Sequence, residues 1–142
     1  MWNKAYSKIY QNVTKEVVWD LLVDVNNWPK WHTNLEYCEM EGEFIAGNNF
    51  LLKPKKAPIA KVDILEAKAY THFTDCTKFL GAKMYNTYAL EEIKGSLRLN
   101  HKIVVTGILK WVWVMLVAKN IATNIPGKID SLVKNAQFMK NN

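Results

Sequence analysis

The sequence predicts a single α+β domain in which a curved antiparallel sheet wraps around one long C-terminal helix. Three observations predict it: about seven strand-like segments, glycine-containing turns between the later strands, and an apolar helical period over the last thirty or so residues. After residue 35 the strands follow one another without intervening helices, which indicates a meander rather than a β-α-β fold. The long helix is then the only sizeable element against which the sheet can bury its apolar face.

The first third of the chain alternates between strand and helix signals. Residues 3–11 alternate weakly and predict the first strand. Thr14 is placed to cap a helix whose apolar positions run to Val25 and which ends at Asn26-Asn27. Pro29 suits the first turn of a second short helix.

From Leu35 onward the apolar period is two, and strands are expected over residues 36–44, 48–54, 61–66, 69–78, 83–93 and 96–106. After Gly107, apolar residues at helical spacing from Ile108 to Phe138 predict the long helix. Pro126 is expected to kink or locally break this helix, because proline removes a backbone hydrogen bond.

Composition limits the classes of function. The 142 residues contain no linker, so residues 1–142 are expected to form one domain, and 49% of them are hydrophobic, which is enough for a sizeable core. The N-terminus is too polar for a signal peptide, and the apolar run from Trp111 to Ala118 is too short to cross a bilayer. We therefore expect a soluble, cytoplasmic protein that is a monomer or a weak dimer.

The net charge of +6 comes from eighteen lysines and one arginine, Arg98, scattered along the chain. Arginine forks are the usual readers of guanine edges and phosphates, so their scarcity argues against a nucleic-acid partner. A solvated surface is the favoured interpretation, with an anionic partner or a membrane surface as the alternative.

Catalytic and metal-binding patterns are missing from the sequence. The two cysteines, Cys38 and Cys76, have no CxxC partner, and the histidines, His32, His72 and His101, lack ligand spacing. No serine or cysteine lies in a nucleophile motif, and no glycine-rich phosphate loop is present. We expect no metal and no cofactor.

Three segments resemble one known family. Residues 16–31 (EVVWDLLVDVNNWPKW) are similar to the opening helices of the START-like, helix-grip superfamily, and in particular to its bacterial polyketide cyclase/dehydrase and lipid-transport group. Glu41-Gly42-Glu43-Phe44 with Gly47 and Leu52-Lys53-Pro54 resembles that group's second and third strands. Tyr88-Ala89-Leu90-Glu91, Gly95 and Val105-Thr106-Gly107 resemble its end. The resemblance spans nearly the whole chain and implies the helix-grip fold; it is not specific for one activity, because the superfamily includes carriers, sensors and enzymes.

Strand parity identifies the residues expected to face the helix. In the last strand these are Leu97, Leu99, His101, Ile103 and Val105, and in the preceding strand Met84, Asn86, Tyr88 and Leu90. For residues 69–78 both parities remain open, and the set with Phe73 is favoured because it matches the family's inward aromatic position. The candidate ligand-binding residues are Trp28, Trp31, Phe50, Phe73, Met84, Asn86, Tyr88, Leu99, His101, Ile103, Val112 and Met115.

Several of these residues also have a purely structural interpretation. Trp28 and Trp31 are as well suited to lock the short helix over the sheet as to rim a pocket, and a lone histidine such as His101 is more often a core residue than a base. Of Trp111 and Trp113, one should pack on the sheet and the other should be partly exposed, because helix positions two residues apart do not share a face.

Three hypotheses of function follow. The first is a binder or carrier of a small hydrophobic molecule, such as a lipid, a fatty acid or a polyketide-like aromatic, held between sheet and helix. The second is a cyclase or dehydratase in which His101 or Tyr88 transfers a proton. The third is a protein-interaction module that uses the lysine-rich surface or an exposed Trp113.

Overall fold

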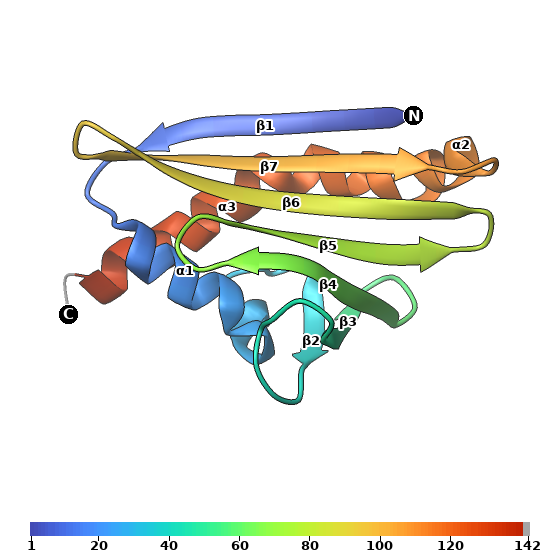
Figure 1. The fold of residues 1–142 in the computed structure, drawn as a ribbon, viewed down its shortest axis with the longest axis horizontal. Helices are drawn as coiled ribbons and strands as arrows, with labels where there is room; N and C mark the ends of the chain where they lie inside the picture. Colours follow the sequence, from blue (N-terminus) through green and yellow to red (C-terminus); the bar gives the residue numbers. More distant parts are fainter. Residues whose placement is uncertain (141–142) are drawn as a thin grey trace.

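A computed structural model, which describes residues 1–140, shows a seven-stranded antiparallel sheet packed against a long C-terminal helical segment (Figure 1). The elements are β1 (Trp2–Tyr10), α1 (Lys15–Val23), the 3-10 helix η1 (Val25–Lys30), β2 (Leu35–Glu39), β3 (Asn49–Pro54), β4 (Ala60–Lys68), β5 (His72–Phe79), β6 (Ala82–Ile93), β7 (Ser96–Thr106), α2 (Lys110–Trp113), the π-helical turn η2 (Val114–Ala118) and α3 (Lys119–Lys140). This arrangement confirms the predicted helix-grip fold.

The sheet has the strand order β1-β7-β6-β5-β4-β3-β2. Consecutive strands from β2 to β7 pair as neighbours, and β1 joins the far edge beside β7. The turn between β6 and β7 consists of Lys94 and Gly95, both with positive φ (48° and 84°), as the tightest hairpins require. This turn pins the register in which Tyr88 lies opposite His101.

Helix α3 runs along the inner face of the sheet (Figure 1). Its buried residues recur every three or four positions, so one stripe of the helix faces the sheet: Ile125, Ile129, Leu132, Val133 and Ala136. They share one core cluster with the inward residues of β7, namely Leu97, Leu99, Ile103 and Val105. Thr14 caps α1, as predicted, by accepting a hydrogen bond from the backbone N–H of Val17 at 3.4 Å.

Two predicted strands are shorter than expected. The strand predicted over 36–44 ends at Glu39, because the side chain of Asn48 donates to the carbonyl oxygens of Glu41 and Glu43 and holds the chain in a loop. The strand predicted from residue 69 begins at His72, because Tyr70 adopts a positive φ of 63° in the preceding turn.

Of the predicted kink or local break at Pro126, the break is wrong. Helix α3 continues from Lys119 to Lys140, and Pro126 lies on its exposed side, where the carbonyl oxygen left without a helical donor can be hydrated. The irregular turn lies earlier, at the π-helical residues Val114–Ala118.

This π-helical turn changes which residues face the sheet. Trp111 precedes Ala118 by seven residues, or two α-helical turns, and would share its buried face in a regular helix. The wider turn retards that rotation, so Trp111 is 58% exposed whereas Ala118 is buried. Val112 and Met115, expected to face the ligand, are 47% and 77% exposed for the same reason.

Candidate functional site

The inward strand faces lie as predicted. Phe73, Asp75 and Thr77 of β5 are buried, which settles the parity left open for that strand. In β6 and β7, Met84, Tyr88 and His101 are buried with their aliphatic neighbours.

Aromatic side chains pack much of the space between sheet and helix where a cavity for a small hydrophobic molecule was expected. Phe73 packs edge-on to Phe44 with ring centres 4.9 Å apart and stacks on Tyr88 at 4.7 Å. Trp28 packs edge-on to Phe50 at 5.2 Å and donates its indole N–H to the carbonyl oxygen of Leu22 at 2.9 Å. Phe50, Phe73, Met84, Leu99 and Ile103 of the candidate set, together with Trp28, are therefore core residues in this structure.

A polar cluster crosses this core and ends at Lys128 of α3. The Lys128 ammonium nitrogen Nζ donates to the hydroxyl oxygen of Tyr88 and lies 3.0 Å from Nδ1 of His101. The other ring nitrogen of His101, Nε2, lies 2.9 Å from Oδ1 of Asn86. Because Asn86 Oδ1 can only accept, Nε2 carries the proton and Nδ1 accepts from Lys128. The predicted inward polar groups thus satisfy one another, with a lysine as the added member.

Burial favours the neutral form of these groups. It lowers the pKa of Lys128 from 10.5 to about 7, and the charge of Asp75 opposes this shift. It lowers the pKa of His101 well below its usual value, and the neighbouring Lys128 charge adds to that effect. Burial also raises the pKa of Tyr88 well above its usual value. Near neutral pH, Lys128 can therefore exist as a cation or as a free amine.

Asp75 lies at the inner side of the cluster. Burial raises its pKa from 3.8 to about 7, against the opposing effects of a hydrogen bond from Asn86 and the charge of Lys128. Within residues 1–140, its Oδ1 is the buried side-chain oxygen for which no hydrogen-bond partner is found. An unpaired oxygen of this kind costs about 1–3 kcal/mol, and protonation of Asp75 reduces that cost.

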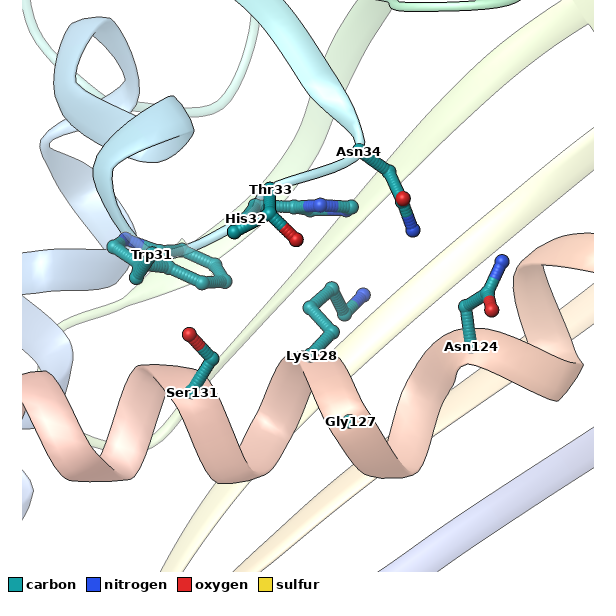
Figure 2. Close-up of a pocket in the computed structure, with 8 residues that line it drawn as sticks. All are labelled: Trp31, His32, Thr33, Asn34, Asn124, Gly127, Lys128 and Ser131. Atoms are coloured by element: carbon teal, nitrogen blue, oxygen red, sulfur yellow. The ribbon is translucent and has the colours of Figure 1, made fainter.

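A pocket of about 200 Å³ opens beside Lys128, between α3 and the segment that follows η1 (Figure 2). Its lining comes from Trp31, His32, Thr33 and Asn34 on one side and from Asn124, Gly127, Lys128 and Ser131 on the other. Figure 2 shows the Lys128 side chain rising from α3 toward His32 and Asn34, with Nζ at its tip. Gly127 faces open space, since a Cβ built there meets no atom within 4 Å.

His32 forms part of the pocket wall. Burial, followed by the charge of Lys128, lowers its pKa to about 3, so its ring is neutral at physiological pH. The ring centres of Trp31 and His32 are 5.9 Å apart and give this wall two planar surfaces. The pocket therefore offers one amine, several neutral polar groups and flat ring surfaces.

Of the residues predicted for the site, Trp31 lines this pocket, and Asn86, Tyr88 and His101 support its lysine from behind. Lys128, His32 and Asp75 were not among the predicted site residues. The available signal for Lys128 was its spacing, three residues after Ile125 and four before Leu132, which places a lysine at the edge of the apolar face of the helix.

In the described part of the chain, no three His, Cys, Asp or Glu side chains come together as possible metal ligands.

Comparison with solved structures supports the fold. A hypothetical protein from Helicobacter pylori superposes with a TM-score of 0.77 at 13% identity, over 95% of this chain and 88% of its own. A START superfamily protein from Mycobacterium smegmatis gives 0.76 at 11% identity, over 96% and 98%. The di-domain ARO/CYC protein StfQ of the steffimycin biosynthetic pathway gives 0.78 at 8% identity, over 99% of this chain and 52% of its own, so this chain spans about half of it. The chain has the START-like, helix-grip fold.

No protein-family model and no curated protein matches the sequence.

Proposed function

We propose that the protein binds a compact organic molecule in the Lys128 pocket, with a carbonyl or carboxylate oxygen on the lysine and an apolar part against Trp31. The observation that carries this proposal is the position of Nζ, which is fixed by Tyr88 and His101 and faces an open pocket. Protonated lysine has three donors, and Tyr88 and His101 occupy two of them, which leaves the third for a ligand oxygen.

The size of the pocket favours the smaller of the hydrophobic ligands considered. Pockets that bind drug-sized ligands measure about 300–1,000 Å³, whereas this pocket measures about 200 Å³. A long acyl chain would have to displace the aromatic residues that fill the core, at a cost of several buried contacts. A single-ring or short-chain acid, ketone or aldehyde fits without such a change.

Two variants test binding. Gly127→Leu extends a side chain into the pocket and replaces a glycine inside a helix, a change worth about 0.8 kcal/mol in favour of the helix. Lys128→Met removes the amine and keeps a side chain of similar length. The measurement is calorimetric titration with a panel of aromatic and short-chain acids, ketones and aldehydes, after native mass spectrometry of the purified protein for a retained ligand.

We expect the wild type to bind a member of the panel, and both variants to lose that binding while remaining folded. Lys134→Met, at an exposed position of the same helix, is the matched control and should bind as the wild type does. Binding that survives in both Gly127→Leu and Lys128→Met would place the ligand elsewhere and overturn the proposal.

Carbonyl chemistry at Lys128 is the second candidate function, in place of proton transfer by His101 or Tyr88, whose side chains are buried behind the lysine. A lysine with a pKa of about 7 provides neutral amine at physiological pH, and such an amine attacks ketones and aldehydes. The amine adds to the carbonyl carbon, and loss of one water from the adduct leaves an imine. Borohydride reduction followed by peptide mapping would find the reduced adduct on Lys128 if this reaction occurs, and only on exposed lysines if it does not.

A further inference from the structure

At one end of the molecule α2, the β5–β6 turn and the N-terminus lie near one another (Figure 1), and these segments carry many of the exposed apolar residues. Ile108 is 93% exposed, Leu80 80%, and Met115 77%. We call this set the apolar end; its exposed members are Met1, Leu80, Ile108, Leu109, Trp111, Val112, Met115 and Leu116. Exposed apolar residues concentrated on adjacent segments are typical of an interaction site.

The apolar end is held as one surface rather than as separate loops. The indole N–H of Trp113 donates to the carbonyl oxygen of Leu80 at 2.7 Å. The backbone N–H of Leu109 donates to the carbonyl oxygen of Gly81 at 2.9 Å. The ring of Trp113 also stacks on Phe79 with centres 4.5 Å apart. These contacts fix the start of the C-terminal helical segment on the β5–β6 turn, so Leu80 and the exposed helix residues keep fixed relative positions. Trp111 is the exposed tryptophan and Trp113 the packed one, contrary to the interaction hypothesis drawn from the sequence.

The charges that neighbour the apolar end along the chain are of one sign, although Asp63 of β4 lies opposite Cys76 on the adjacent strand. Lys78 and Lys83 lie directly opposite each other at the base of the β5–β6 turn, and Lys110 and Lys119 flank the exposed helical residues. Residues 78–90 and 93–129 contain no aspartate or glutamate. Like charges facing each other across a strand pair are destabilising, and an anionic partner relieves that repulsion.

This composition fits a membrane surface better than a protein partner. Lysine is depleted in protein–protein interfaces, whereas peripheral membrane sites combine tryptophan and aliphatic residues with surrounding lysines. Peripheral binding to a bilayer strengthens with the apolar area inserted and with the attraction of basic residues to anionic lipids, and the apolar end supplies both.

We propose that the apolar end docks onto an anionic lipid bilayer, with Leu80, Ile108, Trp111 and Met115 in the interfacial region and the surrounding lysines against the lipid headgroups. The docking is peripheral. Within residues 1–140, the structure contains no helix of the length and apolarity needed to span a bilayer.

The test is co-sedimentation of the full chain with phosphatidylcholine vesicles that contain or lack phosphatidylserine. We expect binding to the phosphatidylserine vesicles that weakens as salt is raised, and loss of binding in the double variant Trp111→Glu/Met115→Glu. The double variant Lys78→Gln/Lys83→Gln should bind about 25-fold more weakly, because each lysine near an anionic surface contributes about fivefold. Because all four substituted side chains are exposed, these variants should fold, which circular dichroism checks.

Ile45→Glu is the matched control, since Ile45 is 53% exposed in a loop outside the apolar end and should not affect vesicle binding. Absence of vesicle binding by the wild type would overturn the proposal, as would equal binding by wild type and Trp111→Glu/Met115→Glu. A wild-type dimer in analytical ultracentrifugation that Trp111→Glu/Met115→Glu dissociates, without vesicle binding, would instead make this end a contact between two copies of the chain.

Discussion

Replacing Lys128 with methionine should remove the rise in the free energy of unfolding that the wild type shows as the pH increases above 7. Burial lowers the pKa of Lys128 in the folded protein to about 7, whereas the ordinary value is 10.5. Between these two values the unfolded chain binds a proton that the folded chain has released, so raising the pH favours folding. At about 1.4 kcal/mol for each pH unit, this lysine alone raises the free energy of unfolding by about 1.5 kcal/mol from pH 7 to 8.5.

Other buried groups also change the free energy of unfolding between pH 7 and 8.5, by a few tenths of a kcal/mol each. The raised pKa values of Asp75, Cys38 and Cys76 oppose the rise, and the lowered pKa values of His32 and His101 add to it. The expected net rise for the wild type is about 1 kcal/mol, and Lys128→Met should be flat or fall slightly.

The assay is urea unfolding at a series of pH values between 7 and 8.5, at constant ionic strength, followed by tryptophan fluorescence. Lys134→Met, which changes an exposed lysine of α3, should keep the slope of the wild type. A wild-type stability that falls over this range, or a rise that persists in Lys128→Met, would show that Lys128 keeps its proton in the folded state and would refute the reasoning.

Three further predictions concern the frame of the site. Asp75→Asn should make the melting temperature rise more between pH 5 and pH 7 than it does in the wild type. The raised pKa of Asp75 makes its contribution to stability fall as the pH rises from about 4 to about 7, which opposes the rise that the lowered pKa values of His32 and His101 produce. Gly107→Ala should lower the melting temperature by about 10 °C, equivalent to about 3 kcal/mol, because Gly107 has a φ of 112° and a Cβ there would lie 2.4 Å from the carbonyl oxygen of Gly81. Trp28→Phe should reduce the free energy of unfolding by about 2 kcal/mol in urea titrations, because the buried carbonyl of Leu22 loses its donor, and an unchanged value would mean that water replaces the indole.

The sheet and its inward faces could be predicted because strand parity is a local property. Once the β6–β7 turn was placed at Lys94 and Gly95, alternation alone assigned Tyr88 and His101 to the inner face. The polar cluster could be predicted in part for the same reason. Its central member was not predicted, since Lys128 is joined to Tyr88 across forty residues, and its position at the edge of the apolar helix face was the one local signal.

At the start of the C-terminal helix, local spacing predicted the wrong face. Regular helical spacing assigned Val112 and Met115 to the inner face, and the π-helical turn at Val114–Ala118 rotates them outward. A turn that adds one residue to the helical repeat shifts what precedes it by about 100°, and the sequence Val-Met-Leu-Val-Ala carries no proline or glycine to mark it. The same turn contributes Trp111, Val112 and Met115 to the apolar end.

The pocket and the apolar end both lie on the C-terminal helical segment. Because they involve different residues, separate substitutions can test the two proposed roles. Leu116 and Asn124 are eight residues apart, about 12 Å along a helix axis, so a bilayer at the apolar end would lie close to the pocket. If the two sites act independently, Gly127→Leu abolishes ligand binding and leaves vesicle binding unchanged, and Trp111→Glu/Met115→Glu does the reverse. If vesicles instead raise the affinity for a ligand, Trp111→Glu/Met115→Glu should remove that increase without changing the affinity in solution. Reciprocity requires the ligand then to strengthen vesicle binding by the same factor, and a one-sided effect would exclude coupling through a common folded state.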